Sequence, residues 1–467
     1  MQVMKKYLSL LIIPFMLSFS FSAYAGGDEQ SGFKTLEEQI KKLQDLVLAQ
    51  NNRIEKLERG QRSIRLNGSD AQGQDVSDEL FREKFDQNFE RKVGQADQWL
   101  KGLDFKADFR LRYEGLDFSS GSPAETDPRN RFRMRLRYGF EKKFNPDMKV
   151  GFFLSSGGTT DPTSTNATLD GNFVFKSTVI ERAFAEYTPG WAEVGILDKL
   201  TITAGKFKNP FEKGSSKLIW DRDVRPEGIY EKFDLVLYDG DNVTIDGWLT
   251  LGQFVLDEDG TVSGDAELFA FQGGANFVFN APFFEKPVDL NLSSSFYNYV
   301  DYAVRGNFGA FARGNPNLNG DGELDATDFG VITGYADLTV QTFGKPLKLF
   351  VDVAKNVSNH APLASGHGQD FAWAIGVKLG KAKKRGHWQV GYEYRYIEPN
   401  SVVGAFSDSD FGLGHADKRG SVFSAAYKLT DDLALKGSAF FVNNISADTI
   451  LRDEEQRRFQ VDLVWKF

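Results

Sequence analysis

The sequence predicts an all-β transmembrane barrel of about 16 antiparallel strands, preceded by a signal peptide and an N-terminal periplasmic coiled-coil helix. Three observations predict the barrel: an alternating apolar and polar C-terminus, strand-length segments with unequal connections, and no later run of ~18 apolar residues that a spanning helix needs. A barrel strand is apolar on its lipid face only, so the composition resembles that of a soluble protein. A large soluble all-β protein is the alternative.

The first 25 residues are expected to be a signal peptide, cleaved after Ala25. Lys5 and Lys6 precede an apolar stretch, which a small-x-small site follows. Removing these two lysines from 56 basic residues leaves 54 against 65 acidic ones, a net charge near −11 that argues against a nucleic-acid partner. Without cysteine, the chain has no disulfide framework or thiolate metal site.

Residues 33–66 are predicted to form a coiled coil, because apolar residues recur at alternating intervals of four and three residues. Two glutamines, Gln50 and Gln61, interrupt this heptad pattern. Its residue types favour two strands by the simple rule, but a trimeric barrel would require a three-stranded stalk. The alternative is a single amphipathic helix lying on the barrel or on peptidoglycan, the candidate partner of this segment. Residues 67–102 are interpreted as a polar linker with a short helix. The heptad positions are Leu36, Ile40, Leu43, Val47, Ile54, Leu57 and Ile64.

The predicted barrel occupies residues 103–467. Its connections alternate in length: short turns such as Asn145-Pro146, Gly344-Lys345-Pro346 and Asp431-Asp432 mark one rim, and longer Gly- and Asp-rich loops mark the other. Short periplasmic turns and long external loops are typical of outer-membrane barrels. The strand segments are 103–117, 129–143, 147–157, 176–189, 198–208, 231–239, 243–257, 263–279, 286–302, 329–342, 346–358, 369–381, 386–398, 417–430, 432–447 and 454–467.

The last segment closes on an aromatic residue, and its apolar side chains share one face. This pattern resembles the insertion signature of bacterial outer-membrane β-barrels, which implies outer-membrane lipid and the barrel assembly machinery as partners. The segment 178–188, by contrast, does not sort into two faces, which suggests a bulge or a subunit interface. The signature residues are Phe459, Val461, Leu463, Trp465 and Phe467.

A row of arginines is the sharpest local feature. Strand alternation places four of them on one face, with Phe132, Met134, Leu136 and Tyr138 opposite. Because a guanidinium facing lipid costs ~2–4 kcal/mol near the midplane, they are expected to line the lumen. They form either an anion-attracting basic wall or a structural ladder neutralised by carboxylates. The row is Arg131, Arg133, Arg135 and Arg137, joined by Arg110 and Arg112 from the preceding strand.

The stretch from Gly205 to Phe211, followed by Asp221 to Gly228, resembles the putative porin family of Gram-negative outer-membrane β-barrels, which are similar to general and phosphate-type trimeric porins. The resemblance implies a homotrimer and a passive diffusion channel for small hydrophilic solutes or ions. It also implies a third loop at about 209–230 that folds into the lumen, where Asp221, Asp223 and Glu227 face the arginines. An ordinary exposed acidic loop is the alternative.

One external loop has the oxygen spacing of a calcium site and resembles the dockerin type of EF-hand loop. Asn at its first position departs from that pattern, and an Asn/Asp/Gly-rich loop without an ion is the alternative. No cofactor is expected to be required; Ca²⁺ is the candidate ion. The ligands would be Asn317, Asn319, Asp321, the Glu323 carbonyl, Asp325 and Asp328.

Enzymatic activity is not expected. The four histidines are scattered near predicted loops or a strand start, without a recognisable hydrolase motif. A barrel hydrolase, or a structural or adhesive barrel tethered through its coiled coil, are the alternatives to a channel.

Overall fold

The computed structural model describes residues 100–119, 128–258, 265–284, 286–302, 313–315, 329–358, 369–445 and 455–467. The predicted signal peptide, the coiled coil, residues 67–99 of the linker and the 317–328 calcium loop lie outside these residues. The chain divides into two compact units, Met1–Ala96 and Asp97–Phe467. All the strands described in the following paragraphs belong to the second unit. Within the described residues, no helix is long and apolar enough to cross a membrane.

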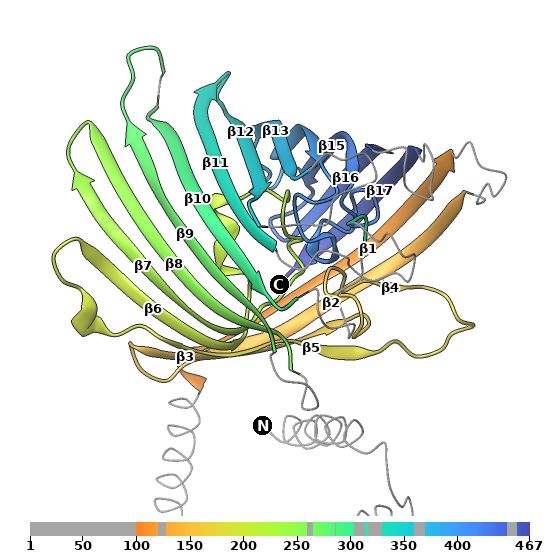
Figure 1. The fold of residues 1–467 in the computed structure, drawn as a ribbon, viewed down its shortest axis with the longest axis horizontal. Coiled ribbons are helices and arrows are strands. Elements are labelled where there is room, and N and C mark those ends of the chain that lie inside the picture. Colours follow the sequence, from red (N-terminus) through yellow and green to blue (C-terminus); the bar gives the residue numbers. More distant parts are fainter. Residues whose placement is uncertain are drawn as a thin grey trace, which may run out of the picture. The chain divides into compact units, whose positions relative to one another are not determined.

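The described chain forms one antiparallel sheet of 17 strands (Figure 1). One of them, β4 (Ala167–Thr168), has only two residues, so 17 − 1 = 16 strands form the barrel wall. They are β1 (Leu103–Ser119), β2 (Arg129–Lys143), β3 (Met148–Ser156), β5 (Thr178–Tyr187), β6 (Leu197–Lys206), β7 (Glu227–Asp239), β8 (Val243–Asp257), β9 (Ala266–Phe279), β10 (Val288–Val300), β11 (Phe329–Thr342), β12 (Lys345–Asn356), β13 (Phe371–Gly380), β14 (Trp388–Ile397), β15 (Lys418–Lys428), β16 (Leu433–Asn444) and β17 (Glu455–Lys466).

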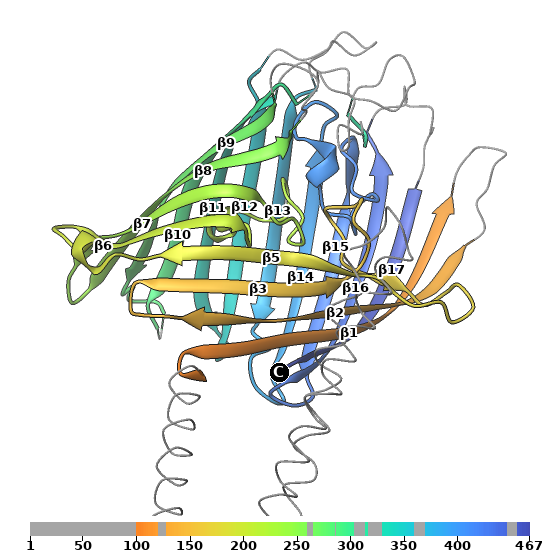
Figure 2. The ribbon, with the colours of Figure 1, turned by 90° about the horizontal axis from the view of Figure 1, so that it is seen from below.

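The sheet closes on itself. Each of the sixteen wall strands pairs with the next wall strand along the chain, and β17 returns to pair with β1 from Asp108↔Lys466 to Ser119↔Glu455. Closure leaves neither β1 nor β17 as a free edge of the sheet, which is a condition for a sheet that contacts hydrocarbon. In Figure 2, β1, β2, β3 and β5 lie strongly oblique to β13–β17. The predicted barrel of sixteen strands is confirmed.

The two faces of the wall differ in the predicted way. Along β17, exposed Phe459, Val461, Leu463 and Trp465 alternate with buried Arg458, Gln460 and Asp462. The apolar set faces outward and the polar set faces the interior. The same alternation holds in β1, where Leu111 and Tyr113 are exposed while Arg112 and Glu114 are buried.

Two local irregularities have sequence causes. The segment 178–188, whose side chains do not alternate between two faces, carries a bulge. The pairing of β3 with β5 shifts register at Phe153/Leu154, so Glu181 and Arg182 both turn inward. β7 begins four residues earlier than predicted, at Glu227 rather than at residue 231. Pro226-Glu227-Gly228 has turn chemistry, but Gly228 extends the strand at φ 143, where a Cβ would lie 2.1 Å from the Gln253 carbonyl oxygen.

The turn at one rim is also tighter than expected. Phe343 and Gly344 form a two-residue hairpin loop with φ of 48° and 66°, the left-handed pair that a type I′ turn requires. Lys345, which the sequence places in the turn, already belongs to β12.

The outward face of β17 provides a test of the barrel. Replacing Val461, which is 51% exposed, by arginine (Val461→Arg) should destabilise the protein by about 2–4 kcal/mol, because the guanidinium would face hydrocarbon. Denaturant unfolding in phospholipid vesicles measures the change. Thr339→Arg, on the interior face of β11, is the matched control and should cost clearly less; equal losses would contradict the assignment of the two faces.

Candidate functional site

The third long loop, residues 207–226 between β6 and β7 (hereafter L3), folds into the barrel interior (Figure 1). Its 3-10 helix, η2 (Pro210–Gly214), begins where the Asn209 side chain accepts a hydrogen bond from the Phe211 amide at 2.9 Å. Gln272 on β9 donates to the Phe211 carbonyl at 3.1 Å, and Ser293 on β10 donates to the Gly214 carbonyl at 3.0 Å. An in-folded third loop was predicted, but its bounds were set at 209–230.

A glycine is needed where η2 meets the wall. A Cβ on Gly214 would lie 2.3 Å from the Ser293 hydroxyl oxygen. Further along L3, the Ser216 amide donates to Asp352 on β12 at 2.7 Å. L3 therefore crosses the interior faces of β9, β10 and β12.

L3 packs against a second inward loop, residues 398–417 between β14 and β15 (hereafter L7). The Trp220 ring lies 5.7 Å from Tyr297 and 5.9 Å from Phe406 of L7, and its Nε1 donates to Tyr299 at 3.2 Å. The Asp221 amide donates to the Phe406 carbonyl at 2.7 Å. The surrounding buried apolar cluster, which includes Phe211 and Phe411, fills part of the interior and fixes both loops.

The six predicted arginines do line the interior faces of β1 and β2, and we call them the arginine ladder. Each has a carboxylate partner: Arg112 with Asp462 at 2.6 Å, Arg135 with Asp108 at 2.7 Å, Arg137 with Asp223 at 2.6 Å, Arg131 with Glu114, Arg133 with Glu114 at 3.8 Å, and Arg110 with Asp462 at 3.8 Å. Their side chains are only 5% to 17% exposed. This geometry favours the neutralised ladder over the open basic wall.

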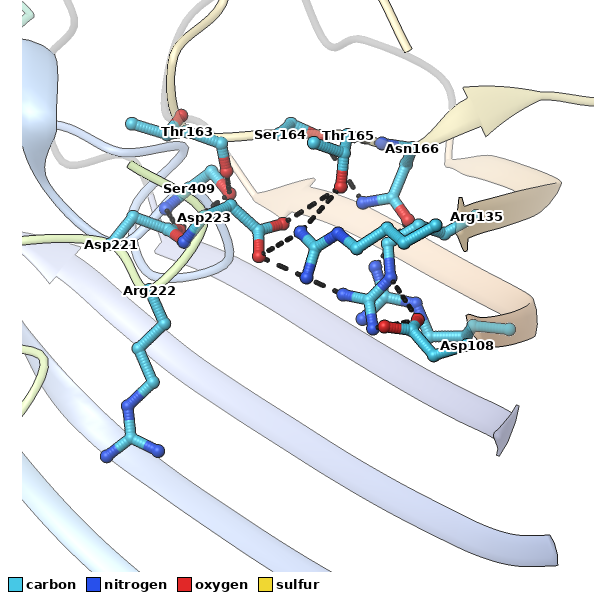
Figure 3. Close-up of polar contacts among 12 residues, drawn as sticks. Asp108, Arg135, Thr163, Ser164, Thr165, Asn166, Asp221, Arg222, Asp223 and Ser409 are labelled. Atoms are coloured by element: carbon cyan, nitrogen blue, oxygen red, sulfur yellow. Dashed lines mark hydrogen bonds and ion pairs between the residues drawn. The ribbon is translucent and has the colours of Figure 1, made fainter. Parts of the chain in front are cut away.

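Of the three acidic residues expected to face the arginines, one does so. Asp223 contacts Arg137 at 2.6 Å. It also lies 3.8 Å from Arg135, the ladder arginine labelled in Figure 3. Asp221 turns away from the ladder and accepts hydrogen bonds from the Asp223 amide at 2.7 Å and from Ser409 of L7. The prediction for Glu227 is wrong: it is the first residue of β7, its side chain is 61% exposed, and it pairs with Lys206.

A third segment, residues 163–166 between β3 and β5, lies against the arginine ladder (Figure 3). Asn166 accepts from Arg110, Ser164 accepts from Arg133 at 3.4 Å, and Thr165 accepts from Arg137 at 2.7 Å. These neutral acceptors give the terminal guanidinium nitrogens further hydrogen bonds without adding charge, although the Nε atoms of Arg110, Arg133 and Arg137 are buried without a hydrogen-bond partner among the described residues.

Sequence reasoning missed the acidic residues of L7. Asp408 accepts from Lys217 at 2.9 Å and from Arg395 at 2.8 Å. Asp410 contacts Arg112 and Arg458, both at 3.1 Å. The alternating Ser-Asp run from Ser407 to Asp410 was the available signal, because two closely spaced carboxylates in a protein with a row of arginines are expected to form ion pairs with them.

Burial and pairing act in opposite directions on the two acids of L3. Burial raises the pKa of Asp221 to about 7, an effect that nearby Lys217 only partly offsets. Burial also opposes ionisation of Asp223, but Arg137 and Arg135 outweigh it and hold the pKa of this carboxyl below its usual range. Asp223 is therefore an anionic anchor at neutral pH, whereas Asp221 changes charge near neutrality.

Among the described residues, no cluster of three or more His, Asp or Glu side chains could hold a metal ion. The 317–328 loop lies outside them, so calcium binding there stays a prediction.

Comparison with known proteins decides the family, because residues 123–330 and 326–467 match the family described as putative porin. The chain belongs to the putative porin family. It is an outer-membrane porin, a channel for passive diffusion rather than an enzyme. No curated protein sequence matches this porin.

Among solved structures, this porin is similar to OprB from Pseudomonas putida at 12% identity and a TM-score of 0.47, over 81% of this chain and 96% of that chain. It is also similar to OmpF from Salmonella typhi in complex with daunomycin, at 12% identity and a TM-score of 0.43, over 78% of this chain and 97% of that one. The anion-selective porin from Comamonas acidovorans has 12% identity and a TM-score of 0.41, over 78% and 99%.

The contact between L3 and L7 should depend on pH through Asp221. Because its pKa is higher in the folded chain than the ordinary 3.8, the folded state binds more protons between pH 4 and about 7, and the stabilisation is lost as the pH rises through about 7. We expect more open-channel current fluctuation at pH 8 than at pH 5. Asp221→Asn should remove most of this difference; an unchanged pH dependence in that variant would contradict the role of Asp221.

Proposed function

We propose that small hydrophilic solutes cross this porin between L3 and the wall formed by β7 to β13, and that the arginine ladder anchors L3 rather than lining the passage. One observation carries the proposal: the interior charges on that wall contact water more than the ladder does. The Lys348 side chain on β12 is 36% exposed and that of Lys232 on β7 is 26% exposed, against at most 17% in the ladder.

The proposed constriction follows from how L3 is held. Asp223 binds the ladder on one side of the barrel, and the Ser216 amide binds Asp352 of β12. A loop fixed at both points narrows the lumen without moving aside, so it limits the size of the solutes that pass.

The absence of cysteine makes the path testable, since an introduced thiol is the sole site for a thiol-specific reagent. The purified porin should give stepwise currents in a planar bilayer, and a bulky reagent should strongly reduce the single-channel current of Lys348→Cys. Arg131→Cys, in the ladder, is the control and should change much less. A protein without stepwise currents would refute the channel, and stronger block at Arg131→Cys would place the path along the ladder.

We further propose that the porin assembles as a homotrimer through β5 to β7, with the arm before the barrel in the periplasm. Tyr230 packs inward, 4.8 Å from Phe207, so alternation turns Glu231 outward between Ile202 and Leu251. A carboxylate facing lipid is unfavourable, and a subunit interface would remove it from lipid. The solved OmpT of Vibrio cholerae includes a trimer form.

Reversing this charge tests the assembly. Glu231→Arg should dissociate the trimer on native gels in mild detergent, while Glu267→Arg, on the outward face of β9 near its loop end, should not. A wild-type protein that is monomeric, or a Glu231→Arg variant that stays trimeric, would contradict this interface.

A further inference from the structure

One cation on L3 is positioned unlike all the arginines of the ladder. Arg222 lies between Asp221 and Asp223, whose contacts with L7 and with the ladder fix the backbone on both sides. The Arg222 carbonyl also accepts a hydrogen bond from Arg225 at 2.7 Å. The backbone at Arg222, from which the side chain extends, is therefore held in place.

The Arg222 side chain itself is exposed and, within the described residues, has neither an ion pair nor a hydrogen bond. Figure 3 shows it extending away from Asp221, Asp223 and the ladder. Its guanidinium keeps a full, hydrated charge, whereas the charges of the ladder are compensated by carboxylates at short range.

Lys378 lies on the interior face of β13, between two strands that L3 reaches. The Ser216 amide binds Asp352 of β12, and Lys217 shares Asp408 with Arg395 of β14. Lys378 lies over the Phe350 ring at 5.0 Å and likewise has no ion pair among the described residues. Two acids on strands beside β13 are engaged by other cations: Asp337 of β11 pairs with Lys348, and Glu393 of β14 pairs with Arg395.

Among the described residues, Arg222 on L3 and Lys378 on the wall are therefore two cations without an ion pair beside the proposed path. Both side chains attract an anion that enters this path, and both repel a cation. A guanidinium also offers paired donors that fit the oxygens of a carboxylate or phosphate.

We propose that Arg222 and Lys378 select small anions, above all carboxylates and phosphates, at the L3 constriction. This inference rests on the proposed path between L3 and the β7 to β13 wall. It assigns selectivity to one loop arginine and one wall lysine, and not to the arginine ladder.

Reversal potentials across a KCl gradient in planar bilayers test the assignment. Arg222→Cys should lower the chloride-to-potassium permeability ratio severalfold, and Lys378→Gln should lower it in the same direction. Modifying Arg222→Cys with a positively charged thiol reagent should restore the ratio, whereas a negatively charged reagent should lower it further. The effect should shrink at high salt, because ions screen exposed charges.

Arg419→Cys, at an exposed position on the outward face of β15, is the matched control and should leave the ratio unchanged with either reagent. Micromolar to millimolar phosphate should reduce the chloride current of the wild type more than that of Arg222→Cys. Stepwise currents with an unaltered permeability ratio in the Arg222 and Lys378 variants would overturn the inference and leave the channel intact. Absence of stepwise currents from the wild type would instead overturn the proposed function.

Discussion

The structure depends on a constraint set by hydrocarbon, which offers no hydrogen-bond partner to a peptide group. The pairing of β1 with β17 meets it, because it gives partners to the two strands that would otherwise be edges. Closure also fixes the sidedness of each strand, since a one-residue slip would turn Val461 inward and Asp462 towards lipid. The arrangement of charge in the interior follows from this register.

Inside the wall, the dominant problem is the cost of enclosing many charges. The molecule solves it by bringing acids to the arginines from several directions: Glu114 from β1 itself, Asp462 from β17, Asp223 from L3 and Asp410 from L7. Removing one partner from such a network leaves another buried charge uncompensated, which costs more than the pair itself stabilises. The loops and the wall are therefore mutually dependent.

The sequence was sufficient to predict the strands of the barrel wall, because a strand with lipid on one side and water on the other must alternate apolar and polar side chains. All sixteen segments overlap the strands of the barrel, and the inward orientation of Arg131 to Arg137 followed from the same rule. Loop geometry was less accessible. Nothing in the local pattern around Asp221 and Glu227 distinguished an inward carboxylate from a rim residue, since that depends on contacts with Ser409 and Lys206, both distant in the sequence.

The hydrogen bond between Arg112 and Asp462 joins residues separated by 350 positions. Contacts of such long range delay folding, because the entropy of closing the chain is lost before the contact can repay it. The first and last strands of the barrel cannot meet until the whole span between them has been made. Until then the growing sheet has two open edges, whose unpaired backbone groups can pair with another chain as readily as with each other.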